Sequence, residues 1–144
     1  MILIPVKVIL DTNCFLSCIG KKSSFRNIFD AFLKEEYTLC VSSEILLEYE
    51  EKFQEFWGEE VSSNLLGVLL TSSNISFHHV YFNFKLVKGD ADDNKFVDAF
   101  ITSSADFLIS NDIKLLAVNE VKFPAITVMN IQDFSLYLKK RLKK

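Results

Sequence analysis

Four acidic residues stand at positions in this sequence from which their carboxylates could meet. Asp11 ends the apolar run of residues 6–10, and Asp112 ends the run of residues 107–111. Glu48 lies inside an amphipathic segment, and Asp93 opens another. A cluster of carboxylates is costly because like charges repel, and a bound divalent metal ion offsets that cost. The four positions therefore predict a metal-dependent hydrolase.

Each acid taken alone also has a simpler interpretation. An Asp at a strand end commonly forms a turn or a cap, and a lone helical Glu is commonly solvated. Glu44 lies one turn before Glu48 on the same side of the predicted helix, so either could face the site. The acids of residues 90–92 compete with Asp93 as cap or ligand. Asp98 is rotated away from the apolar stripe of its helix, and we expect it to be solvated.

The segments that would position these acids alternate between strand and helix. Short β-branched or apolar runs predict strands at residues 6–10, 38–41, 107–109 and 125–129, and residues 76–84 are ambiguous. Asp11 to Asn13 should form a strand-to-loop junction. Capped stripes with a 3.6-residue period predict helices over residues 25–33, 44–57, 60–71, 94–101, 113–118 and 131–142, with Gly58 ending or kinking the second. This order predicts a single domain over residues 1–144, a three-layer α/β/α sandwich with a mostly parallel central sheet of four to five strands.

Composition narrows the function classes. The chain has 144 residues, 49% of them hydrophobic, with a net charge of −3, so any surface that binds a polyanion must be local. Cys14, Cys18 and Cys40 match neither a zinc signature nor a disulfide framework, and they predict buried thiols in a reducing cytoplasm. The chain carries no signal-peptide pattern and no apolar stretch of membrane-spanning length. We therefore expect a cytoplasmic protein.

Four motifs, in order, resemble the PIN domain family. They are Val-Ile-Leu-Asp-Thr-Asn (8–13), Ser-Ser-Glu-Ile-Leu-Leu-Glu-Tyr (42–49), Asp-Ala-Asp-Asp-Asn-Lys-Phe (90–96) and Ala-Asp-Phe-Leu-Ile-Ser-Asn-Asp-Ile-Lys-Leu-Leu (105–116). The resemblance covers residues 6–129 and is greatest to the toxin components of toxin–antitoxin pairs. Ala91 replaces the family's usual proline, and Ser110-Asn111 replaces Thr-Gly. Neither change removes a carboxylate.

The resemblance implies a ribonuclease that uses Mg²⁺ or Mn²⁺, with an antitoxin protein as partner. It assigns Asp11, Glu48, Asp93 and Asp112 to the acidic site. Asp11 and Asp93 are expected to be the principal ligands, because hard oxygen donors suit these ions. Asn13 and Ser110 are expected to position the ligands or water.

RNA would need local positive charge beside the acids. The candidates for phosphate contacts are Lys21, Lys22, Arg26, Lys95 and Lys114. The basic tail of residues 139–144 is expected to be a solubilising helix end. We expect Phe15 to be available for stacking on bases, and His78 and His79 to be structural residues in a strand away from the motifs.

Two other functions fit parts of the pattern. A haloacid-dehalogenase-like phosphatase would use Asp11 as its nucleophile, but its general acid would fall at Asn13, and Glu48 would have no role. A non-catalytic module that binds RNA or protein would keep the fold without needing the acids. Apolar residues around 45–70 also suggest a homodimer.

Overall fold

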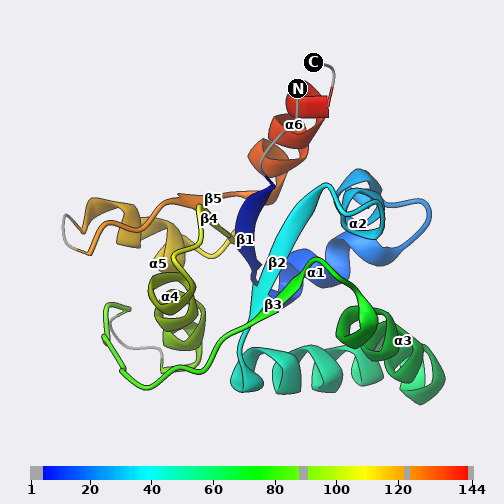
Figure 1. The fold of residues 1–144 in the computed structure, drawn as a ribbon, viewed down its shortest axis with the longest axis horizontal. Coiled ribbons are helices and arrows are strands. Elements are labelled where there is room, and N and C mark those ends of the chain that lie inside the picture. Colours follow the sequence, from blue (N-terminus) through cyan, green and yellow to red (C-terminus); the bar gives the residue numbers. More distant parts are fainter. Residues whose placement is uncertain (1–4, 88–90, 122–123, 143–144) are drawn as a thin grey trace.

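A five-stranded parallel sheet forms the centre of the protein (Figure 1). The computed structural model describes residues 5–87, 91–121 and 124–142. The strands lie in the order β3-β2-β1-β4-β5, and every pairing between them is parallel. Their bounds are β1 Val6–Leu10, β2 Tyr37–Val41, β3 Ile75–Phe77, β4 Phe107–Ile109 and β5 Val128–Met129. The predicted strand at 125–129 is shorter than expected, and only the start of the ambiguous segment at 76–84 is a strand.

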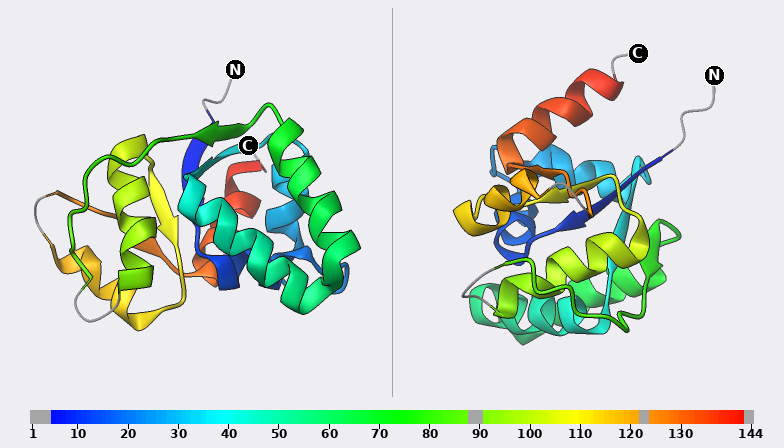
Figure 2. Two further views of the ribbon diagram at one scale, coloured as in Figure 1. Left: turned by 90° about the horizontal axis from the view of Figure 1, so that it is seen from below. Right: turned by 90° about the vertical axis from the view of Figure 1, so that its left-hand side faces the viewer.

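Helices cover both faces of the sheet (Figure 2). They are α1 Thr12–Ile19, α2 Arg26–Leu33, α3 Ser43–Thr71, α4 Ala91–Ser103, α5 Ile113–Leu116, the 3₁₀ helix η1 Ala117–Glu120 and α6 Ile131–Leu142. The Tyr37 ring lies 5.4 Å from that of Phe134 in α6, and its hydroxyl donates to the carbonyl of Ile28 in α2. Cys40, on the opposite face of β2, hydrogen-bonds Ser103 of α4. The predicted three-layer α/β architecture is confirmed.

The segment after Asp11 differs from its predicted loop. Helix α1 begins at Thr12 with Asp11 at its N-cap, and it buries Cys14, Phe15 and Cys18 against the core. The Phe15 ring is 1% exposed and lies edge-on to the Tyr49 ring at 5.0 Å. The prediction that Phe15 stacks on bases was therefore wrong, because its ring is part of the core.

Helix α3 is two helices separated by a kink. Gly58 has φ +87°, a left-handed conformation that L side chains rarely adopt, and the break predicted there is confirmed. Ser42 caps the first half by accepting a hydrogen bond from the Ile45 amide. That cap fixes where the helix leaves β2 and so where Glu48 points. Within the described ranges, no helix is long and apolar enough to cross a membrane.

Candidate active site

The topology brings the ends of β1 and β4 to one edge of the sheet. Leu10 pairs with Ile109 in parallel register, and the Asp11 amide donates to the Ile109 carbonyl at 2.9 Å. Residues that follow these two strands therefore emerge side by side at their carboxyl ends, where open α/β sheets place their sites. Asp11, Ser110 and Asp112 all emerge there.

Asp11 is buried at this edge, at 8% exposure. The Ser110 hydroxyl donates to its Oδ2 at 2.7 Å, and the Asn13 amide also bonds the carboxylate. Burial raises the pKa of Asp11, the two hydrogen bonds lower it, and the carboxylates of Glu48 and Asp112 raise it further. The structure thus brings Glu48 and Asp112 close enough to Asp11 to repel its carboxylate.

Glu48 joins the cluster from helix α3. The Thr12 hydroxyl donates to its Oε2, and Lys95 Nζ of α4 lies 2.7 Å from its Oε1. The side chains of Lys95 and Glu48 are only 12% and 22% exposed. Lys95, which was predicted to contact phosphate, forms an ion pair inside the site.

Thr12 and Tyr49 are site residues that the sequence analysis missed. Each directly follows a predicted acid, which is the signal that could have found them. The buried Tyr49 hydroxyl donates to the carbonyl of Leu10, the residue before Asp11. This bond ties the first turns of α3 to the end of β1 and so holds Glu48 near Asp11.

Asp112 and Asp93 occupy two different helix starts. Asp112 is the N-cap of α5, and its Oδ1 accepts from the Lys114 amide at 2.8 Å. Its amide donates to the Ser110 hydroxyl at 3.0 Å, which links it to Asp11. Asp93 lies partly buried in the first turn of α4, in line with the buried Phe96. Asp93 therefore lies on the buried side of α4, in its first turn.

Asp98 corrects the expectation of a solvated side chain. It is 3% exposed, and its Oδ1 accepts from the Phe84 amide at 3.0 Å. Burial raises its pKa, the bond from Phe84 lowers it, and Glu44 raises it. The irregular segment of residues 78–87 covers this side of α4, which helical phase alone does not reveal. Asp90, one of the rival acids, lies outside the described residues.

The other basic residues that were predicted to contact RNA lie at different distances from the acidic residues. Lys21, Lys22 and Arg26 follow α1, whose eight residues span roughly 12 Å, so they stand at the far end of that helix from Asp11. Arg26 is also engaged, since it pairs with Asp30 at 2.9 Å and donates to the Ile19 carbonyl. Lys114 is exposed at the start of α5, beside Asp112.

The donor set fits a hard divalent cation in its chemistry. Its members are carboxylate oxygens, and a cation would relieve the repulsion that raises the pKa of Asp11. As the side chains stand, no group of three or more His, Cys, Asp or Glu in the described part of the chain is arranged to hold a metal. Both Glu48 oxygens are engaged by Thr12 and Lys95. Glu48 would therefore have to exchange Lys95 for the ion.

Comparison with known proteins identifies the family. The family model described as "PIN domain" matches residues 7–114. The chain belongs to the PIN domain family. This confirms the resemblance seen in the motifs, and the matched range contains all four acids. The sequence matches no curated protein at a significant level.

Solved structures share the PIN fold at low identity. One is VapBC2 from Rickettsia felis bound to a DNA fragment from their promoter, with TM-score 0.59, 18% identity, and coverage of 87% of this chain and 98% of that one. A second is VapC20 from Mycobacterium tuberculosis, a Sarcin-Ricin loop cleaving toxin, with TM-score 0.57, 12% identity, and coverage of 76% of this chain and 94% of that one. A third is the PIN domain endonuclease Utp24, with TM-score 0.52, 19% identity, and coverage of 88% of this chain and 85% of that one. At these identities the likeness establishes the fold alone.

Proposed function

We propose that this PIN domain is an endoribonuclease that uses Mg²⁺ or Mn²⁺ and acts as the toxin of a toxin–antitoxin pair. The observation that carries the proposal is the position of Asp11, which is buried at the carboxyl edge of the sheet beside Glu48 and Asp112; burial first, and then these two carboxylates, raise its pKa. Family membership supports it, and the similar structures include a toxin that cleaves the Sarcin-Ricin loop and a PIN domain endonuclease.

Asp11, Glu48, Asp93 and Asp112 would hold one or two ions, with Asp11 and Asp93 as principal ligands. The bound metal supplies a nucleophilic water at neutral pH and stabilises the developing charge on phosphate. Ser110 and the Asn13 amide hold the Asp11 carboxylate in one orientation. Lys95 holds Glu48 in place and would have to release this carboxylate for it to bind an ion.

RNA would approach this edge from the side of α5. Lys114 is exposed there beside Asp112 and would contact a phosphate next to the cleaved bond. Lys21 and Lys22 are exposed beyond the far end of α1, so they would contact phosphates farther along the strand. In Arg26 the guanidinium bonds mainly fix the turn between α1 and α2.

The proposed partners are an antitoxin protein and a second copy of the chain. Helix α3 supports an interface, because large apolar side chains are exposed along it: Leu47 66%, Phe56 68%, Trp57 43%, Val61 38%, Val68 37% and Leu70 63%. Light scattering after size exclusion would measure the oligomeric state, and Phe56→Glu should dissociate a dimer built on this face. The proposed location is the cytoplasm, in keeping with three free buried cysteines.

The decisive experiment is metal-dependent RNA cleavage. Purified protein is incubated with end-labelled RNA and Mn²⁺ or Mg²⁺, with and without EDTA, beside Asp11→Asn and Asp93→Asn. Asp133→Asn, an exposed acid of α6, is the matched control. Cleavage that needs the ion and is lost in both site variants supports the proposal. Phosphatase activity without RNA cleavage would point to the nucleophilic Asp11 instead, and RNA binding without either activity to a non-catalytic module.

A further inference from the structure

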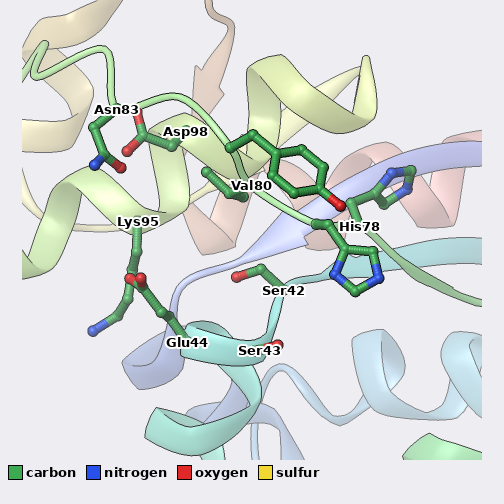
Figure 3. Close-up of a pocket in the computed structure, with 10 residues that line it drawn as sticks. Ser42, Ser43, Glu44, His78, Val80, Asn83, Lys95 and Asp98 are labelled. Atoms are coloured by element: carbon green, nitrogen blue, oxygen red, sulfur yellow. The ribbon is translucent and has the colours of Figure 1, made fainter.

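Figure 3 shows the residues that line a polar pocket. The pocket lies beside the acidic edge, because Lys95 lines it and is paired with Glu48. Its volume is about 140 Å³, and residues lining it include Ser42, Glu44, His78, Asn83, Lys95 and Asp98. It is open between the start of α3, the start of α4 and the segment after β3. Lys95 belongs to both places, because it lines the pocket and its Nζ lies 2.7 Å from Glu48. His78 and His79 line this pocket, so their predicted position away from the motifs was wrong.

The charges around the pocket favour a ligand that donates hydrogen bonds. Glu44 and Asp98 bring two carboxyl groups to the pocket against the single ammonium group of Lys95. Burial and the nearby Lys7 lower the pKa of His78, so its ring is neutral at neutral pH. A phosphate would meet repulsion here, whereas amino and imino N–H groups would meet acceptors.

Aromatic rings stand in a row beside the pocket. Phe77, His79 and Tyr81 alternate along the chain, with ring centroids 5.0 Å apart for the first pair and 6.0 Å for the second. The His79 and Tyr81 rings are stacked at 29°. Tyr81 is 90% exposed, so hydrophobic burial within the chain does not account for it. Exposed rings in series are the usual platform for unpaired RNA bases.

We propose that this pocket receives a guanine base of the RNA substrate, on a nucleotide close to the cleaved bond. Guanine presents two adjacent donors, N1–H and the exocyclic amino group, which a carboxylate accepts in parallel, as it accepts an arginine fork. Glu44 is the acceptor, and the Asn83 amide donates to O6. The base stacks against the row of His79 and Tyr81. Asp98 serves to position the segment through its bond from the Phe84 amide.

Position and selectivity follow from the contacts already described. Lys95 separates the pocket from Glu48 by a single side chain, so the bound nucleotide lies beside the acidic cluster. Adenine, cytosine and uracil each lack the paired donors that Glu44 would accept. This inference rests on the proposed ribonuclease function, which it deepens by naming the preferred base.

Direct binding of nucleosides tests the pocket without any cleavage. The isotope-labelled full chain is titrated with guanosine, inosine and adenosine in EDTA, and amide shifts are followed by NMR. Guanosine should shift amides of residues 42–44 and 78–83, and inosine, which lacks the exocyclic amino group, should bind at least about fivefold more weakly. Glu44→Gln should abolish that difference, whereas Glu51→Gln, an exposed glutamate elsewhere on α3, should keep it. Equal shifts with all three nucleosides, or none in this region, would overturn the proposal.

Mapping of cleavage sites provides a second, independent readout. Wild-type protein should cut a random-sequence RNA pool with guanine enriched at one fixed position, and Tyr81→Ala or Glu44→Gln should remove the enrichment. Leu33→Ala, at an exposed apolar position of α2, should leave it intact. Guanosine binding without any RNA cleavage would contradict the proposed ribonuclease activity but not guanine binding in the pocket. Cleavage with no base preference, together with no nucleoside binding, would contradict guanine binding in the pocket but not the ribonuclease activity.

Discussion

The acidic edge and the neighbouring pocket are built in different ways. Asp11 and Ser110 follow sheet strands directly, and both are buried and bonded to each other. The pocket is walled by the irregular segment 78–87, which side-chain bonds from Asp98 and Asn94 hold to α4. The buried carboxylate of Asp11 is thus held by the rigid sheet, whereas part of the pocket wall lies on an irregular segment whose sequence can vary with less effect on the core.

The largest expected difference between the two regions is in stability. Phe15→Ala removes a ring that contacts Tyr49, Phe53 and Phe29, and it should lower the free energy of unfolding by about 3–5 kcal/mol. Tyr81→Ala, in the exposed row, should change it by no more than about 0.5 kcal/mol. Urea unfolding measures both. Equal losses would mean that the pocket segment is as integral to the core as the acidic edge.

Ser110→Ala tests how far the acidic edge depends on fixed geometry. Loss of the hydroxyl removes the 2.7 Å bond to Asp11, and the cleavage rate should fall about 10–100-fold, as it does when groups that orient metal ligands are lost. Initial rates on labelled RNA at saturating Mn²⁺ measure the effect. Ser63→Ala, at an exposed position on α3, should keep full activity, and an unchanged rate in Ser110→Ala would remove this serine from the site.

Asp11→Asn should stabilise the fold while it removes activity. The folded-state pKa of Asp11 is raised above its ordinary value of 3.8, so the folded form is favoured below that value and loses stability as pH rises through the folded pKa. The neutral amide avoids this loss. The variant should be more stable than the natural protein at pH 7, with a higher Tm, and should gain little at pH 4. Thermal unfolding across that range checks the sign, and a gain that did not depend on pH would contradict the raised pKa of Asp11.

The smallest expected effect is that of Lys95→Met on Mn²⁺ affinity. Lys95 lies at the boundary between the acidic edge and the pocket. Because Lys95 and a cation compete for Oε1 of Glu48, the variant should bind Mn²⁺ about threefold more tightly, within the scale of a partly exposed ion pair. Calorimetric titration without RNA measures it. Lys52→Met, which removes the exposed pair with Glu55, should leave Mn²⁺ binding unchanged. Weaker Mn²⁺ binding in Lys95→Met would show that Lys95 orients Glu48 rather than competing with the ion.

Local patterns in the sequence were sufficient to predict which residues lie at the edge of the sheet. The apolar runs ending at Asp11 and Asp112 placed both acids at strand ends, and Gly58 was identified as the break of α3. Contacts between distant segments escaped prediction. Asp98 is buried because segment 78–87 folds over it, and Lys95 meets Glu48 across 47 positions of sequence. Helix α1 was missed because its polar first residues conceal the apolar stripe that follows.

The natural cysteines are buried, so they should contribute little background in chemical labelling. Cys14, Cys18 and Cys40 are at most 2% exposed; burial raises the pKa of Cys14 to about 12 and raises those of the other two. Since the thiolate is the reactive form, all three react slowly with maleimides at neutral pH. Tyr81→Cys or Leu47→Cys would therefore take a fluorophore at a single site in the otherwise natural chain, so that motions of the pocket segment and of α3 can be followed separately.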